Sequence, residues 1–263
     1  MQTVTGIFVS EADAHRAMET LSLNGVPANK ITLLTPGTRN NKDIESVRVD
    51  AAEKPGIGRA IGGVLGAAGG LSGASILFAI IPGVGPVTAA GLLGAAILGA
   101  AGAGVGAAAG ASLENFTTEG LPEDEIFVYE DALRKGRSVV IVFADDAAAA
   151  ESLREQLKAE GAEAIDAARQ QWWIGLRSAE QEHYSASGKD FGNVEQFYRL
   201  GFEDALHARN RCREFDQVSA EMEANLEELQ RQYPGVDLGD AYTEGYQRGR
   251  EYYQKLCDQA KAA

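Results

Sequence analysis

The sequence is poor in positive charge and in cysteine. It has 24 Lys and Arg residues against 38 Asp and Glu residues, which gives a formal net charge of −14 over 263 residues. A chain of this charge is repelled by nucleic-acid phosphates and by anionic lipid headgroups, so we expect neither a nucleic-acid partner nor polybasic docking to a membrane. The only two cysteines, Cys212 and Cys257, lie outside any CxxC spacing. This indicates reduced thiols in a cytosolic setting.

The residue patterns that carry common enzyme chemistry are also missing. The three histidines, His15, His183 and His207, form neither an i,i+4 pair nor the His/Cys cluster that a metal ion needs. No serine lies in a Gly-x-Ser-x-Gly pattern, and no lysine follows a phosphate-binding glycine loop. Acidic clusters at 123–125 and 145–146 fall in expected first turns of helices, where carboxylates favour the helix dipole. The sequence therefore predicts no catalytic residue, no metal site and no cofactor.

Charge is absent altogether from Ala60 to Leu113, between Arg59 and Glu114. The first residues of the chain lack the features of a signal peptide, so we expect any membrane segment to be internal. Proline and glycine predict a turn in the middle of the uncharged run, at Pro82, Gly83, Gly85 and Pro86. The turn leaves two arms, each long enough as a helix to cross a bilayer core of roughly 30 Å. The pattern predicts a transmembrane helical hairpin over 60–113.

Small residues recur every four positions along both arms, which places them on one face of a helix. In lipid, such rows let helix backbones approach closely and drive association. The residues expected to pack helices or copies of the chain are Gly62, Gly66, Gly70, Gly91, Gly99, Gly102, Gly106 and Gly110. Burial of the same hairpin in the core of a soluble oligomer is the alternative.

The polar regions on either side of the run share one pattern. Thr3–Val9 alternates as a strand does, Ser10 is expected to cap a helix, and Lys30–Leu34 resumes a strand. The pattern returns with a strand at Ser138–Ala144, a helix that Asp145 is expected to cap, and a last strand at 163–167. Pro122–Arg134 is expected to be an extra helix. Two βαβ halves predict a ferredoxin-like α+β sandwich.

The C-terminal part has the pattern of a small helical module. Three amphipathic stripes indicate helices within 193–207, 215–233 and 242–256. The first and third stripes carry the same aromatic–glycine–aromatic pattern, Tyr198-x-x-Gly201-Phe202 and Tyr242-x-x-Gly245-Tyr246. This repetition indicates tight glycine crossings in a bundle or a partner-binding surface. The expected domains are the first βαβ half (1–36), a linker (37–59), the hairpin (60–113), a connecting helix with the second βαβ half (114–168) and the helical module (169–263).

The order of these parts resembles a known family. A βαβ unit, an uncharged run with Ile81-Pro82-Gly83-Val84-Gly85-Pro86 at its turn, and Gly120-Leu121-Pro122-Glu123-Asp124-Glu125 before a second βαβ unit are similar to bacterial general stress proteins of the heat-induced type. The resemblance covers about residues 3–167, and it implies membrane association and expression under stress. It carries no catalytic residues.

Together these features predict a non-enzymatic, homo-oligomeric protein of the inner (cytoplasmic) membrane. The lipid bilayer is its expected partner, both termini face the cytoplasm, and no other protein partner is indicated. The alternatives are a ligand-binding sensor module, a soluble oligomer that buries the hairpin, and a pore.

Overall fold

The computed structural model describes residues 2–37, 76–81, 83–91, 123–211, 215–234 and 238–262. The chain divides into two compact units. The α/β unit comprises Met1–Pro122 and Val128–Ala168, and the helical unit comprises Glu123–Phe127 and Arg169–Ala263.

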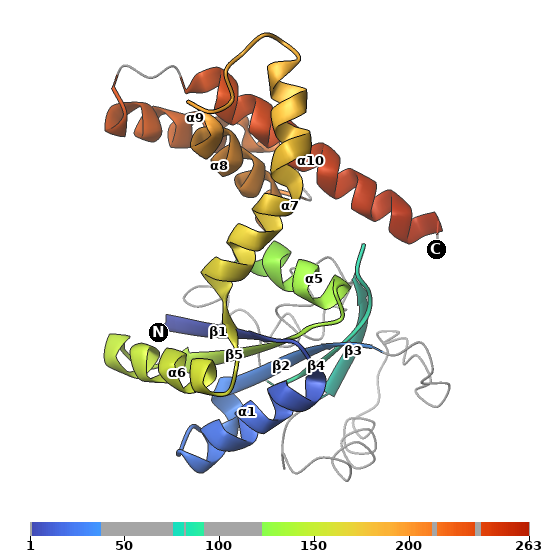
Figure 1. Ribbon diagram of the computed structural model, residues 1–263, viewed down its shortest axis with the longest axis vertical. Coiled ribbons are helices and arrows are strands. Elements are labelled where there is room, and N and C mark those ends of the chain that lie inside the picture. The colour runs from blue at the N-terminus through green and yellow to red at the C-terminus, as the bar shows by residue number, and fades with distance from the viewer. Residues whose placement is uncertain are drawn as a thin grey trace. The chain divides into compact units, whose positions relative to one another are not determined.

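The α/β unit is built on an antiparallel sheet with the strand order β3-β4-β2-β5-β1-β6 (Figure 1). Its elements in chain order are β1 (Gln2–Phe8), α1 (Glu11–Leu23), a 3-10 turn (Ala28–Lys30), β2 (Ile31–Pro36), β3 (Ile76–Ile81), β4 (Gly85–Ala90), α5 (Ile126–Arg134), β5 (Ser138–Ala144), α6 (Ala147–Ala159) and β6 (Glu163–Ala164). The two expected strand–helix–strand halves are therefore present as β1-α1-β2 and β5-α6-β6, interleaved in one mixed α+β fold.

Capping side chains set the start of both helices in these halves. Ser10 Oγ accepts a hydrogen bond from the Asp13 amide at 3.2 Å, which confirms the cap expected for α1. Asp146, one residue later than expected, caps α6 by accepting from the Ala149 amide at 2.8 Å. The last strand is shorter than the expected 163–167, because α7 already begins at Ile165.

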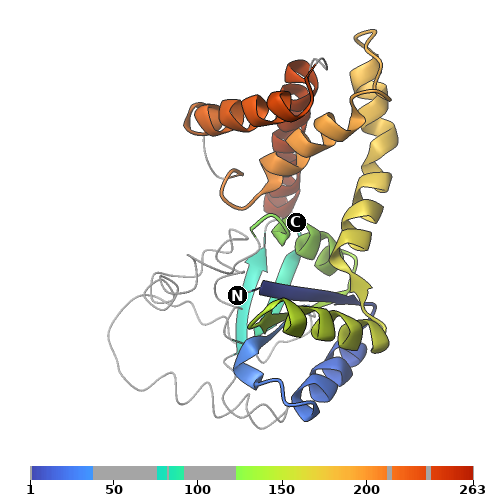
Figure 2. The same cartoon turned by 90° about the vertical axis from the view of Figure 1, so that its left-hand side faces the viewer.

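Helices cover both faces of the sheet (Figure 2). On one face, buried side chains of α1 and α6, among them Met18 and Leu153, pack with Val4 and Val142 of the central strands in one apolar cluster. On the other face lies α5, where the Tyr129 hydroxyl is 2.9 Å from Thr5 Oγ1. All seven residues of β5 are buried, as expected for a central strand covered on both sides.

The expected helical hairpin is wrong for residues 76–81 and 85–90, which form the strands β3 and β4. Ile76 pairs with Ala90 and Ile81 with Gly85, and β4 pairs with β2 through Leu33 and Ala90. A short apolar run next to a Pro/Gly turn is compatible with either a strand or a buried helix, and this run is rich in β-branched residues. Pairing with β2 decides in favour of the strand.

The expected turn is only partly correct. Gly83 lies in the turn with a φ of 74°, whereas Gly85 and Pro86 already belong to β4, and Pro82 lies outside the described residues. Gly91 is also not part of a helix. It follows β4 with a φ of 112°, and a Cβ there would collide with the Ile31 carbonyl oxygen. This glycine therefore permits a close backbone approach to β2.

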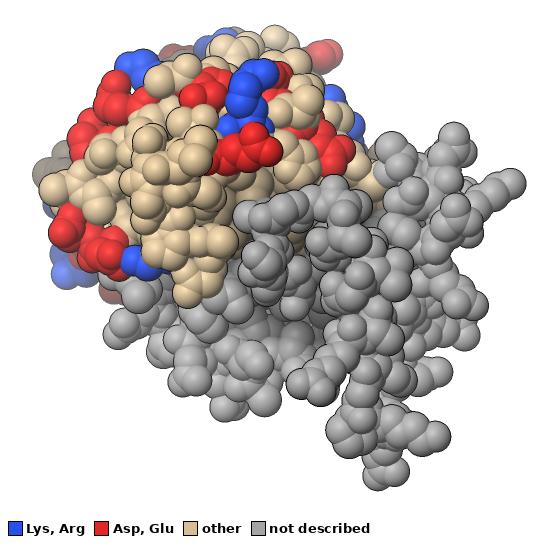
Figure 3. Space-filling view, turned by 90° about the horizontal axis from the view of Figure 1, so that it is seen from below, with Lys and Arg blue, Asp and Glu red and all other residues tan. Residues whose placement is uncertain are grey.

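Acidic and basic side chains lie interspersed on the part of the molecule shown in Figure 3. In the α/β unit several of them pair at the surface, including Arg16 with Asp13 and Lys30 with Asp145. Exposed pairs of this kind contribute little to stability.

The helical unit contains most of α7 (Ile165–Ser185), together with α8 (Glu195–Leu206), α9 (Phe215–Gln232) and α10 (Gly239–Ala262). The last three confirm the helices expected from the amphipathic stripes, whereas α7 was not expected from the sequence. Trp172 and Trp173 of α7 are buried in this unit, and both rings contact Phe202. Among the described residues, no helix is long and apolar enough to cross a membrane.

Candidate functional site in the helical unit

The two copies of the aromatic–glycine–aromatic pattern pack against each other. A Cβ added at Gly201 of α8 would collide with the carbonyl oxygen of Tyr242, and one added at Gly245 of α10 would collide with that of Tyr198. A Cβ added at Gly249 would likewise collide with the carbonyl oxygen of Phe202. The two helices thus cross at backbone contact, and the repeated glycines are needed because no side chain fits there. This confirms the tight glycine crossing expected from the sequence.

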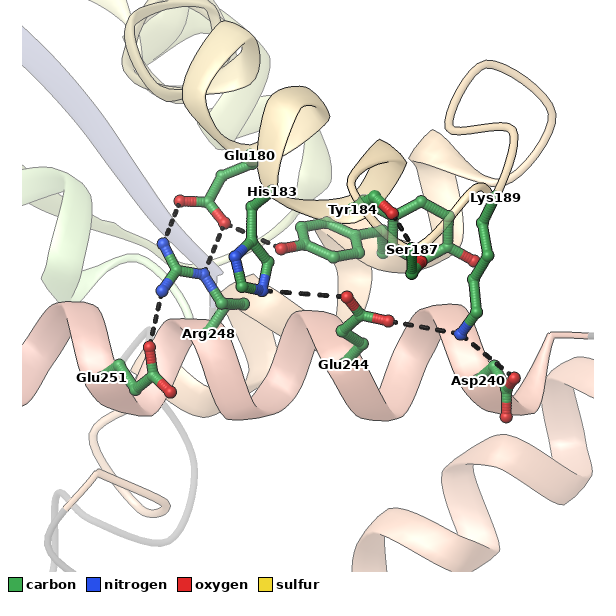
Figure 4. A network of polar contacts seen from close by, with 10 residues as sticks. Glu180, His183, Tyr184, Ser187, Lys189, Asp240, Glu244, Arg248 and Glu251 are labelled. Carbon is green, nitrogen blue, oxygen red and sulfur yellow. Dashed lines mark hydrogen bonds and ion pairs between the residues drawn. The ribbon is translucent and has the colours of Figure 1, made fainter.

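The tyrosine of the first copy, Tyr198, hydrogen-bonds to a buried carboxylate that is paired with an arginine. The Tyr198 hydroxyl donates to Glu180 Oε2 at 2.7 Å, and Arg248 donates to both oxygens of the same carboxylate at 3.0 Å (Figure 4). The side chain of Glu180 is only 6% exposed. Burial, together with the neighbouring carboxylate, raises the pKa of Tyr198, so its hydroxyl stays a donor at neutral pH.

Glu180 lies on α7 and Arg248 on α10, and a more exposed set of charges joins the same two helices further along (Figure 4). Lys189, which follows α7, lies 3.2 Å from Asp240 and 3.4 Å from Glu244 of α10. His183 Nε2 lies 3.8 Å from the other oxygen of Glu244. The hydrogen bond to Asp240 raises the pKa of Lys189. These contacts join the first turns of α10 to the end of α7 and to the segment that follows it.

A second carboxylate, which is only partly buried, accepts hydrogen bonds from an aromatic side chain and from an arginine. Trp173 Nε1 donates to Glu195 Oε1 at 2.9 Å, and Arg177 donates to both oxygens of Glu195 at 2.7 Å. The hydrogen bonds from Arg177 outweigh the effect of burial and lower the pKa of Glu195.

The tyrosine of the second copy, Tyr242, hydrogen-bonds to Asp204 of α8. The Tyr242 hydroxyl donates to Asp204 Oδ2, which also accepts from Asn225 Nδ2 at 3.2 Å. His207, which ends α8 as expected, places Nδ1 3.0 Å from Asp204 Oδ1. Burial favours the neutral carboxyl, but the hydrogen bonds from His207 and Tyr242 prevail and hold the pKa of Asp204 below its ordinary value. Asp204 is therefore an ionised carboxylate that is only 7% exposed.

The three centres share one arrangement, in which a carboxylate accepts a hydrogen bond from a buried aromatic side chain and from a second, basic side chain. Each carboxylate accepts hydrogen bonds from donors within the helical unit and so joins the helices of this unit. Sequence reasoning missed Glu180, Glu195 and Asp204. The only available signal was the repeated tyrosine, because a buried tyrosine hydroxyl requires a partner.

A cavity of about 210 Å³ adjoins the Asp204 centre. Asp204, Arg209, Asn210, Val218, Met222, Ala224, Asn225 and Tyr246 line it. Asn210 is 5% exposed, and its Oδ1 has no hydrogen-bond partner among the described residues. A buried amide oxygen without a donor costs roughly 1–3 kcal/mol.

The glycines expected to pack transmembrane helices are not brought together by the described structure. Gly91 lies after β4 in the α/β unit. Outside the described residues lie Gly62, Gly66, Gly70, Gly99, Gly102, Gly106 and Gly110. Within the described residues, no group of three or more His, Cys, Asp or Glu side chains is placed to hold a metal ion.

Comparison with protein-family models, with curated proteins and with solved structures finds no match to this chain. The resemblance to bacterial general stress proteins stays a prediction from the sequence.

Proposed function

We propose that the protein is a non-enzymatic, homo-oligomeric protein of the bacterial inner membrane, linked to stress, with its folded units and both termini in the cytoplasm. The observation that carries the proposal is the uncharged run from Ala60 to Leu113, in a chain whose net charge is −14. Strands β3 and β4 occupy the middle of this run, so we assign membrane attachment to its outer parts, 60–75 and 92–113. The glycine rows in those parts favour close association of copies in lipid.

The register of the β3–β4 hairpin supports attachment to one face of a bilayer. Ile76, the first residue of β3, pairs with Ala90, the last residue of β4. The chain therefore enters β3 and leaves β4 at the same end of the sheet. The strand order β6-β1-β5-β2 with α1 and α6 supports a ferredoxin-like sandwich as the core of this unit, with β3 and β4 as an extension of its sheet.

Membrane fractionation with an alkaline carbonate wash tests the proposal. We expect the full-length protein to stay in the washed membranes. Leu98→Arg should release a large fraction of it, because an arginine in the middle of an inserted segment costs roughly 2.5–3.5 kcal/mol. The matched control is Leu200→Arg, which changes an exposed leucine of α8 (45% exposed) and should leave the protein in the membranes.

Two outcomes would contradict membrane attachment. Recovery of the unaltered protein in the carbonate supernatant as a large particle would instead support a soluble oligomer that buries the run. Equal behaviour of Leu98→Arg and Leu200→Arg would show that the uncharged run does not hold the protein in lipid. Chemical cross-linking in intact membranes that yields only the single chain would contradict the homo-oligomer.

A further inference from the structure

The start of β2 lies next to the point where the uncharged run leaves the sheet. Ile76, the first residue of β3, pairs with Ala90, the last residue of β4. Gly91 follows β4 and is the last described residue before the outer part 92–113 of the run. A Cβ added at Gly91 would collide with the carbonyl oxygen of Ile31, the first residue of β2, so the two backbones are in contact there. Any surface beside the start of β2 is therefore close to the exit of the run.

The loop between α1 and β2, residues 22–29, is exposed beside this exit and carries no charged side chain. We call it the α1–β2 loop. All of its residues are exposed except Val26, which packs against the apolar cluster that α1 and α6 form with the sheet. Leu23, the last residue of α1, is 87% exposed, more than any other large hydrophobic side chain among the described residues.

The α1–β2 loop has a defined shape. The Val26 amide donates to the Leu21 carbonyl oxygen at 3.0 Å. Asn24 Nδ2 donates to Gln156 Oε1 of α6 at 2.8 Å, which holds the end of α1 against the neighbouring helix. Leu23 therefore extends into solvent from a folded surface, where its exposure has to be offset by another contact or remains unfavourable.

The charges next to the α1–β2 loop are compensated. Lys30, which follows it, lies 2.6 Å from Asp145. Asp146 caps α6, where the helix dipole favours a carboxylate. Because the loop itself has no carboxylate, it is not repelled by lipid headgroups as other parts of this acidic chain are.

The opposite end of α1 has a different character. Val9, which precedes α1, is also 76% exposed. It is followed by Glu11 and Asp13 in the first turn of the helix, so it lies beside negative charge. Of the two exposed apolar side chains at the ends of α1, only Leu23 lies in an uncharged segment beside the exit of the run.

We propose that the α1–β2 loop is the part of the α/β unit that contacts the bilayer, with Leu23 inserted among the lipid headgroups. The inference rests on the proposed membrane attachment, and it names the folded surface that faces the lipid. An apolar side chain at the boundary between headgroups and acyl chains adds to binding through the area that it buries there. The loop would thereby fix the orientation of the α/β unit on the bilayer.

Quenching of a fluorescent dye by lipid tests the proposal. The dye, nitrobenzoxadiazole, is attached to Leu23→Cys or to Val9→Cys of the full-length protein, after replacement of the two natural cysteines by serine. The proteins are bound to phosphatidylcholine vesicles that contain lipid spin-labelled at the headgroup. The 13 residues of α1, about 20 Å long, separate the two positions. We expect several-fold stronger quenching at position 23 than at position 9.

The outcomes separate this inference from membrane attachment itself. Equal quenching at the two positions, or none at position 23 of vesicle-bound protein, would overturn the contact of the loop with lipid and leave attachment intact. Absence of the protein from the vesicles would overturn attachment, and the assignment of the loop with it. Should the serine replacements prevent folding, hydrogen exchange of the unaltered protein decides the question. Vesicles should slow exchange in the α1–β2 loop but not around Val9, and unchanged exchange in the loop would refute the proposal.

Discussion

Tyr198 and Tyr242 occupy the same position in the two copies of the aromatic–glycine–aromatic pattern, and each donates its hydroxyl hydrogen to a buried carboxylate. A buried carboxylate destabilises the fold unless hydrogen-bond donors and positive charge surround it. At Glu180 the positive charge comes from Arg248, which binds both carboxylate oxygens. The stability of the helical unit therefore depends on single side chains whose loss would leave a buried charge without compensation.

The Glu180 centre gives a prediction at the scale of one residue. Arg248→Met should lower the free energy of unfolding of the helical unit by about 3 kcal/mol, because it leaves Glu180 buried without its cation. Urea unfolding followed by tryptophan fluorescence measures this, since both tryptophans of the chain, Trp172 and Trp173, lie in the helical unit.

The control for this prediction is an arginine at the surface. The side chain of Arg231 is 73% exposed and pairs with Glu228 on the same helix. Arg231→Met should change the free energy of unfolding by less than about 0.5 kcal/mol. Similar losses in the two variants would show that the Glu180 centre does not stabilise the unit more than a surface pair does.

At the scale of elements, the crossing of α8 and α10 depends on glycine for a steric reason. Gly245→Ala should destabilise the helical unit by about 1–3 kcal/mol, because the new methyl group would collide with the Tyr198 carbonyl oxygen. Gly175 of α7 is the matched control, because it is exposed and a Cβ there meets nothing within 4 Å. Gly175→Ala should stabilise α7 by up to about 1 kcal/mol through helix propensity. Urea unfolding of both variants measures the two changes in the free energy of unfolding, which should have opposite signs. Two changes of the same sign would contradict the close crossing of α8 and α10.

The elements also show what the sequence could and could not determine. Periodicity and capping residues predicted α1, α6, α8, α9 and α10, because each has a clear apolar stripe. The run Ile76–Ile81 has no polar position to reveal its period, so its length suggested one arm of a helix, and only pairing through β4 with β2 makes it a strand. The helix α7 was not recognised because its buried residues include Glu180 as well as two adjacent tryptophans.

The candidate site was predictable only in part, for a related reason. The repeated tyrosine and glycine could be read along α8 and α10, and their spacing indicated a close crossing. The carboxylate partners of the two tyrosines lie far from them in the sequence, since Glu180 is 18 residues from Tyr198 and Asp204 is 38 residues from Tyr242. Acidic residues are common in this chain, so composition does not single out the few that are buried.

At the scale of the whole molecule, an uncharged run of 54 residues, from 60 to 113, lies in a chain whose other residues carry the entire net charge of −14. The run favours lipid through its apolar residues, whereas the rest of the chain is repelled by anionic headgroups. Anionic lipid should therefore weaken membrane binding by this protein, whereas it strengthens the binding of proteins with basic anchors.

Flotation of the full-length protein with phosphatidylcholine vesicles, with and without phosphatidylglycerol, tests this dependence. At about 0.01 M salt, where the Debye length is about 30 Å, phosphatidylglycerol should reduce binding several-fold. At about 1 M salt, where that length is about 3 Å, the difference should disappear because repulsion is screened while apolar contact is not. Leu98→Arg should bind both vesicle types poorly at high salt, which separates insertion from surface charge. Stronger binding to the anionic vesicles at low salt would show that a local basic surface, rather than the net charge of the chain, governs its approach to the membrane.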